Sequence, residues 1–269
     1  MKTFSTKTNI LPANIFLGCL LFLTTQFLSV MANAQDDVVY PANAKDASYA
    51  ELDQLPDWRG LWFPAFGQVG GGDPVLIGEA KTTWEMHQAR LAADSNYEVP
   101  ETANNCEPDG FPYIMNFPYS LEFLFTPGKI TVIQEALMQV RRIFTDGRPV
   151  PSREELDPNY FGYSRGHWEG DTLVVTTIGT QPGQRLGRPG ITNSDQLTVT
   201  ERIYLDPENE DQLHLDFTFE DPKVLAEPWH LTYTYRRDRT WEQIEYICSQ
   251  NNRHSLDADG QTLPPEELR

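Results

Sequence analysis

Hydrophobic and polar side chains alternate along most of the chain from residue 121 onward, a pattern typical of β-strands with one buried face. The alternation is cleanest over residues 212–219, where every second side chain is apolar: Leu213, Leu215, Phe217 and Phe219. Short connections separate these segments, and some carry turn residues such as Pro127-Gly128. About nine or ten strands in succession would leave two exposed edges, and closing the sheet removes both. We therefore predict an all-β fold, an antiparallel up-and-down barrel.

The same pattern predicts the individual elements. Strands are expected over these segments: residues 57–62, 121–125, 130–134, 138–144, the hairpin of 162–179, 196–205, 212–219, 229–236 and 241–248. Residues 76–93 have helical spacing instead, because their apolar side chains recur every three or four positions. Residues 94–120 show no clear period and predict a long ordered loop, of a kind that often serves as a lid. The barrel should thus carry one N-terminal helix and one long N-terminal loop.

Residues 1–34 have the features of a signal peptide. Two lysines precede an apolar run, and Ala32-Asn33-Ala34 supplies a cleavage site of small residues. We expect a mature chain that begins near Gln35, is periplasmic or secreted, and is not stably inserted in a membrane. Cys19 lies inside the apolar run, so lipidation of this cysteine and an uncleaved anchor are weaker alternatives.

The rest of the chain, roughly 235 residues, suits a single β-rich domain. We predict an extended N-terminal arm over 35–56, the β-barrel domain over 57–253 and a polar tail over 254–269. Cys106 and Cys248 remain as a pair, and an oxidising compartment favours a disulfide between them. Two free thiols are the alternative.

Acidic residues dominate the charge of the chain. There are 39 of them against 21 basic residues, which gives a formal net charge of −18. A chain of this sign repels phosphate backbones, so nucleic acid is not an expected partner. The acidic residues are spread along the sequence without a long block of one sign. This pattern suits a soluble, exported protein, and solubility alone is enough to explain it. The oligomeric state is not indicated by any pattern.

One short motif is similar to the lipocalin-like (calycin) pattern. Gly60-Leu61-Trp62 falls on the first predicted strand, and Arg236 and Arg237 end a late one. In calycins a tryptophan at the equivalent place packs under an arginine from the final strands. The resemblance implies the same contact here, in a lipocalin-like barrel.

A longer series of segments resembles a widespread family of exported bacterial proteins of unknown function, marked by a WEGDTLVV hairpin motif. In order along the chain, the segments are CEPDGFP, PYSLEFLFTPGKITVI, QVRRIFTDGRP, LDPNYFGYSRGHWEGDTLVVTTIG, SDQLTVTERI and WEQIEYICSQNNR. The resemblance implies the barrel, export and the pairing of Cys106 with Cys248. It supplies no agreed catalytic residues. The chain also differs from the family at Tyr163 and Thr198, where histidine is common.

Familiar catalytic and cofactor motifs are missing from the sequence. It contains no nucleophile elbow, no P-loop, no His-Glu-x-x-His and no Cys-x-x-Cys. Its five histidines are scattered, without the paired spacing of a metal site. We therefore predict no cofactor and no metal.

Strand alternation singles out Arg142 and Glu201, because each shares its strand face with apolar side chains. A lone charge on such a face needs a partner or a wet cavity. Either the two form a structural ion pair, or both face the barrel interior beside Tyr163 and His167 around a bound molecule. In the second case His167 would act as general acid or base, Arg142 would hold a carboxylate or developing enolate, and Tyr163 would donate a hydrogen bond.

The sequence thus predicts an exported barrel that accepts a small hydrophobic molecule, aromatic or terpenoid-like. In one hypothesis the protein is a cofactor-independent acid–base enzyme, such as an isomerase, lyase, cyclase or hydrolase. In the other it binds or carries the molecule without turnover. The enzyme hypothesis requires Arg142, His167 and Glu201 to converge in one pocket.

Overall fold

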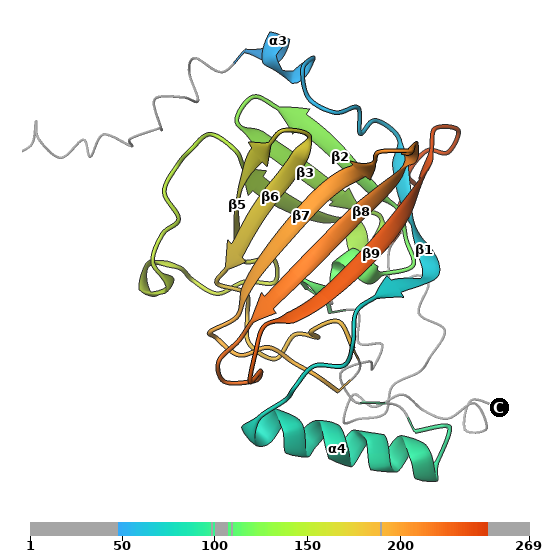
Figure 1. Cartoon of the computed structure of the whole chain (residues 1–269), viewed down its shortest axis with the longest axis vertical. Helices are drawn as coiled ribbons and strands as arrows, with labels where there is room; N and C mark the ends of the chain where they lie inside the picture. The colour runs from blue at the N-terminus through green and yellow to red at the C-terminus, as the bar shows by residue number, and fades with distance from the viewer. Residues whose placement is uncertain (1–47, 98, 100–106, 109, 189, 247–269) are drawn as a thin grey trace, which may run out of the picture. The chain divides into compact units, whose positions relative to one another are not determined.

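The computed structural model describes residues 48–97, 99, 107–108, 110–188 and 190–246. These residues form a closed barrel of nine strands (Figure 1). The strands are β1 (Leu61–Gly70), β2 (Leu121–Thr126), β3 (Lys129–Gln134), β4 (Gln139–Phe144), β5 (Tyr163–Glu169), β6 (Thr172–Ile178), β7 (Thr198–Asp206), β8 (Asn209–Glu220) and β9 (Trp229–Asp238). The helical elements are α3 (Tyr49–Leu52), α4 (Gly78–Ala93) and the 3-10 turns η2 (Tyr113–Asn116), η3 (Ala136–Met138) and η4 (Arg153–Glu155). The predicted all-β barrel is confirmed.

One joint of the barrel differs from the predicted antiparallel pairing. Each strand pairs with the next one along the chain, and β9 pairs back with β1. Every joint is antiparallel except β4–β5, where Ile143 lies opposite Ser164 in a parallel pair. Because a closed ring must return to its starting direction, nine strands require an odd number of parallel joints. The long connection over 145–162 makes this one possible, since parallel neighbours need a crossover of about a dozen residues or more.

The barrel interior is filled by side chains from every second strand position, as the alternation predicts. Leu213, Leu215, Phe217 and Phe219 of β8 are all buried. On β1, the ring of Trp62 lies beside Arg237 of β9, whose guanidinium carbon is 4.5 Å from the ring centre. This is the tryptophan–arginine contact expected from the calycin-like motif.

Residues 110–117 pack into one end of the barrel. Phe111, Ile114 and Met115 are 0%, 1% and 1% exposed. Gln134 Nε2 donates to the Ile114 carbonyl oxygen at 2.8 Å, and the Phe111 amide donates to the carbonyl of Tyr160 at 2.8 Å. The described end of the predicted loop is therefore part of the core.

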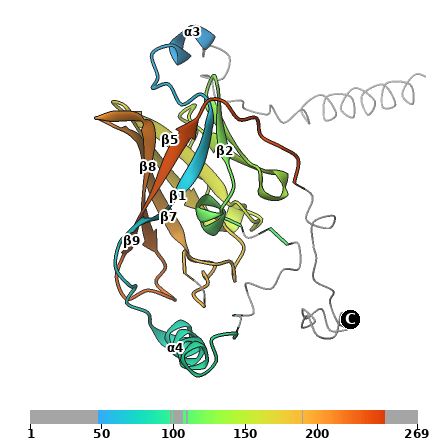
Figure 2. The same ribbon diagram turned by 90° about the vertical axis from the view of Figure 1, so that its right-hand side faces the viewer.

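Helix α4 lies beyond the same end of the barrel, and α3 lies at the opposite end (Figures 1 and 2). The helix predicted over 76–93 is confirmed, beginning two residues later at Gly78. The backbone holds it in place, because the Ile77 amide donates to the Val224 carbonyl at 2.9 Å. Within α4 only His87 is buried, and its Nδ1 lies 2.8 Å from the hydroxyl of Tyr97.

The strand predicted over 241–248 is wrong across its described residues, 241–246, which contain no strand. Because β9 already pairs with β1, the closed sheet has no free edge there. The Asp238 carboxylate ends β9 by accepting hydrogen bonds from the amides of Thr240 and Trp241, at 2.7 and 3.1 Å. The chain then continues against the outside of the barrel, where Gln243 Nε2 donates to the Ile133 carbonyl at 3.3 Å and the ring of Tyr246 lies 5.0 Å from that of Tyr119.

The first strand begins later than predicted, at Leu61, and it continues to Gly70, beyond the predicted end at residue 62. The arm predicted as extended contains the helical turn α3, which Ser48 caps by accepting from the Ala50 amide at 3.1 Å. Cys19, Cys106, Cys248, the signal peptide and the polar tail lie outside the described residues. Within the described part of the chain, no helix has the length and apolar character needed to span a membrane.

Two glycines of the β5–β6 region offer a matched test of backbone strain. Gly162 and Gly170 have φ angles of 62° and 60°. A Cβ at Gly162 would lie 2.5 Å from the carbonyl oxygen of Ile178, whereas a Cβ at Gly170 would meet nothing within 4 Å. We expect Gly170→Ala to lower the free energy of unfolding by about 1 kcal/mol, and Gly162→Ala to add a further ~1–3 kcal/mol for the clash. Equal losses in urea denaturation would contradict the clash.

Candidate functional site

The arginine inside the barrel is Arg141, not Arg142. Arg141 is 2% exposed, while Arg142 faces solvent on the outer side of β4. The prediction took the apolar face with Met138 and Val140 as the interior face. That face lies outside, and the two side chains are 45% and 38% exposed. The placement of Arg142 in the interior is therefore wrong by one strand position.

Glu201 does face the interior, where it is 0% exposed and forms a two-pronged ion pair with Arg141. Arg141 Nη1 donates to Glu201 Oε1 at 2.9 Å, and Nη2 donates to Oε2. The guanidinium also donates to Ser164 Oγ at 3.1 Å and to Thr177 Oγ1 at 3.0 Å. β4, β5, β6 and β7 each supply one residue. The structural ion pair predicted for Glu201 exists with the neighbouring arginine.

Two aromatic residues enclose this ion pair. The Arg141 guanidinium carbon lies 3.9 Å from the centre of the Phe111 ring. Burial raises the pKa of Tyr235 well above its usual value, and the charges of Tyr233 and Glu201 raise it further. No space of water size adjoins Glu201 or Tyr235, since both are 0% exposed. In this enclosed state the Glu201 carboxylate is in contact with protein groups only.

The remaining candidates lie elsewhere on the barrel. The His167 side chain is 61% exposed, and its Nε2 lies 3.2 Å from the carboxylate of Glu169. It points outward because Gly166 faces inward, where a Cβ would lie 2.9 Å from Ile143. Tyr163 is half-buried and stacks on Phe144, with ring centres 5.5 Å apart.

Arg142, His167 and Glu201 thus point to separate places. Of the four predicted site residues, Arg142 and Tyr163 take neighbouring positions on the outer side of the β4–β5 joint, while Glu201 faces the interior. The convergence on which the enzyme hypothesis depends is absent from these side chains.

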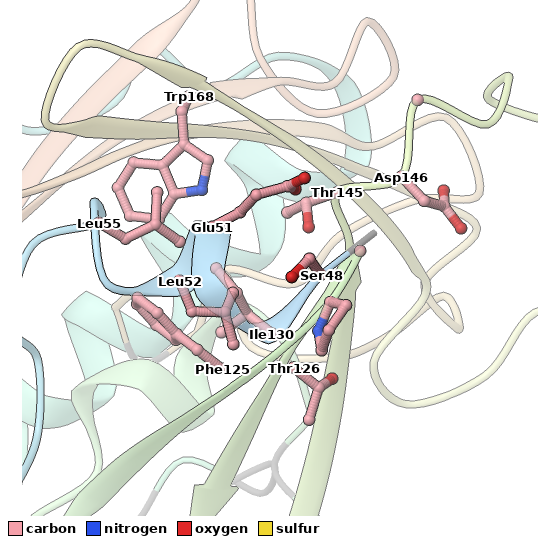
Figure 3. Close-up of a pocket in the computed structure, with 13 residues that line it drawn as sticks. Ser48, Glu51, Leu52, Leu55, Phe125, Thr126, Ile130, Thr145, Asp146 and Trp168 are labelled. Carbon is pink, nitrogen blue, oxygen red and sulfur yellow. The ribbon is translucent and has the colours of Figure 1, made fainter. Parts of the chain in front are cut away.

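A pocket lies at the other end of the barrel, where the segment 48–57 crosses the sheet as a strap. This mouth pocket has a volume of about 510 Å³ between α3, the β2–β3 turn and the ends of β4 and β5 (Figure 3). Its lining residues are Ser48, Glu51, Leu52, Leu55, Phe125, Thr126, Pro127, Gly128, Ile130, Thr145, Asp146, Gly147 and Trp168. The strap covers a rim that would otherwise be open.

Aromatic side chains form a packed wall of the mouth pocket. Trp58 is buried, and its ring centre lies 5.4 Å from those of both Phe125 and Trp168. Phe125 and Trp168 are themselves 5.9 Å apart with a steep interplanar angle of 63°. Both are partly buried, so each packs on Trp58 and still borders the pocket. The wall is fixed before any molecule enters.

The polar rim of the pocket contains two carboxylates. Asp146 is held by Arg148, whose Nε and Nη2 donate to its two oxygens at 2.9 and 2.6 Å. Burial raises the pKa of Asp146, but the hydrogen bonds from Arg148 outweigh it and the pKa lies below its usual value. Glu51 extends from α3 toward Thr145 (Figure 3).

Two further pockets flank the strap. One, of about 410 Å³, is lined by Trp58 and Phe123 among others, and one of about 780 Å³ adjoins Tyr204. Leu55 lines all three pockets, so a single strap residue divides the space at this end of the barrel. Sequence reasoning missed the strap. Its signal was the pair Leu52 and Leu55 near the end of the predicted arm.

Among the described residues, no group of three His, Cys, Asp or Glu side chains could hold a metal ion. Comparison with protein-family models and with curated proteins finds no match to this chain.

Proposed function

We propose that this protein binds a small, partly apolar molecule with an aromatic ring in the mouth pocket, without turnover. The observation that carries the proposal is the partly buried pair Phe125 and Trp168, which borders a covered space of about 510 Å³. Pockets of about 300–1,000 Å³ with apolar and aromatic walls and a few polar groups are typical of small-molecule sites.

The chemistry of the lining favours a ring. Phe125 and Trp168 offer the faces and edges on which another aromatic ring packs. The strap side of the pocket carries Leu52 and Leu55, and both are only partly exposed. A flat apolar molecule would bury surface against both sides at once, and Thr145 at the rim could hydrogen-bond a single polar substituent.

Binding without catalysis is supported by the arrangement of the titratable groups. His167 and Arg142 face solvent, and Glu201 is neutralised by Arg141. The features of a signal peptide support binding in the periplasm or outside the cell, so the protein would capture or carry its ligand there.

Calorimetric titration of the purified protein with 1-naphthylmethanol, a neutral two-ring alcohol, tests the proposal. We expect saturable binding to one site. Trp168→Ala should weaken this binding about 10-fold, since it removes one aromatic contact and part of the buried surface. Leu52→Ser, in the strap and outside the barrel wall, should weaken it in the same direction.

The control is Trp241→Ala, because Trp241 is 63% exposed and does not line the mouth pocket. It should bind the alcohol as the unchanged protein does. If all three variants bind with the same affinity, the site is not the mouth pocket. If the unchanged protein does not bind, the proposed function is wrong.

A further inference from the structure

The charge of the mouth pocket has one sign. Its lining contains the carboxylates of Glu51 and Asp146 and no lysine, arginine or histidine. Asp146 is already paired with Arg148 through both oxygens. For Glu51, no cation among the described residues lies within ion-pair distance. Among the described residues, the lining therefore carries one negative charge without a paired cation, that of Glu51 on α3.

The surroundings of the pocket reinforce this sign. The carboxylates in the two flanking pockets belong to Asp53, Asp57, Asp171, Asp206, Glu208 and Glu210. Three of these six carboxylates have a basic neighbour: Arg59 lies 2.7 Å from Asp57, Arg239 lies 3.4 Å from Glu210, and His214 Nε2 lies 3.0 Å from Asp206. The negative excess in this lining therefore comes from Asp53, Asp171 and Glu208. A cleft lined by charges of one sign concentrates the electrostatic field and attracts the opposite charge. The net charge of −18 acts in the same direction.

The aromatic wall gives a cation a second attraction, independent of the carboxylate. A positive group over the face of a tryptophan or phenylalanine is stabilised by the ring, most strongly when it is partly removed from water. Trp168 and Phe125 line the same pocket as Glu51. The pocket thus combines an apolar wall, aromatic rings and a free carboxylate.

We infer that the preferred ligand is a protonated amine attached to an aromatic or alicyclic ring. Its ammonium group lies at Glu51, and its ring packs on Phe125 and Trp168. The inference rests on the binding function proposed above and adds the ligand class to it. The same charges disfavour an anionic ring compound of the same size.

A matched series on one ring system tests the inference: 1-naphthylmethylamine, 1-naphthylmethanol and 1-naphthoate. At low salt the amine should bind about 10-fold more tightly than the alcohol, and the carboxylate about 10-fold more weakly. Raising the ionic strength should reduce the preference for the amine, because salt screens partly exposed charges. Calorimetry gives all three affinities on the same protein.

Glu51→Gln should reduce the ratio of amine to alcohol affinity to about 2-fold or less. The control is Glu79→Gln, which removes the same charge from an exposed position on α4, at the opposite end of the barrel. It should leave the ratio unchanged. A general weakening of the pocket lowers the affinities for the amine and the alcohol alike. A change in their ratio therefore reports the effect of the charge.

Equal binding of amine and alcohol would overturn the ligand class and leave the proposed function intact. An equal loss of the ratio in Glu51→Gln and Glu79→Gln would overturn the role of Glu51, since the preference would then come from net charge. Failure of all three compounds to bind would overturn both the inference and the proposed function.

Discussion

Replacing Arg141 with methionine is expected to lower the free energy of unfolding by about 3–5 kcal/mol, because it leaves the Glu201 carboxylate buried without a counter-charge. The same substitution at Arg142 should change it by about 0.5 kcal/mol or less, since that side chain faces solvent. Urea denaturation of the two variants measures the difference. A large loss of stability for Arg141→Met beside a small one for Arg142→Met would identify Arg141 as the inward-facing residue independently of the structure.

The loss should exceed that of an ordinary hydrogen bond because every partner of Arg141 is enclosed. Glu201, Ser164 and Thr177 are 0%, 2% and 1% exposed, so water cannot replace the guanidinium. Truncating one member of a buried charge pair leaves the other charge to carry its full desolvation penalty.

A double variant separates the pair from packing. Arg141→Met combined with Glu201→Leu removes both charges and keeps similar volume, so it should recover most of the stability lost by Arg141→Met alone. If the double variant is as unstable as the single one, shape rather than charge makes Arg141 necessary. If both arginine variants unfold alike, the assignment of Arg141 to the interior is wrong.

The fold could be predicted from the sequence because the strands obey a short-range rule. Over 212–219 each inward position is apolar and each outward one is polar, and β8 spans this segment as expected. The rule failed at β4, where the outer face carries Val140 and the inner face carries the charge of Arg141. The backbone also turns just before this strand, with positive φ at Leu137 and Met138. Neither the inward-facing charge nor this backbone turn can be recognised by counting alternate strand positions back from Phe144.

The mouth pocket could not be predicted in the same way, because its walls come from distant parts of the chain. In the sequence, Phe125 and Trp168 are recognisable only as strand residues, and Leu52 only as part of the N-terminal arm. The structure places all three in the lining of one pocket. Their proximity depends on barrel closure and on the parallel β4–β5 joint, which brings β5 beside the end of β4. Such a site arises from topology, and no local spacing encodes it.

Phe111→Ala is the second substitution with a large expected effect, a loss of about 3–5 kcal/mol in the free energy of unfolding. Phe111 is 0% exposed, lies 6.4 Å from Phe217 between ring centres, and covers the guanidinium of Arg141. Alanine would leave a cavity against a buried ion pair and remove the ring face from Arg141. Both effects act in the same direction.

Urea denaturation of Phe111→Ala beside Trp241→Ala measures this loss against an exposed aromatic residue. Trp241 is 63% exposed, so its truncation should change the free energy of unfolding by about 0.5 kcal/mol or less. A loss below about 1 kcal/mol at Phe111 would show that residues 110–117 can leave the barrel at little cost. The ion pair would then be accessible from that end, and Glu201 would regain a possible role in chemistry. A loss in the expected range instead fixes this segment as core and keeps the Arg141–Glu201 pair enclosed.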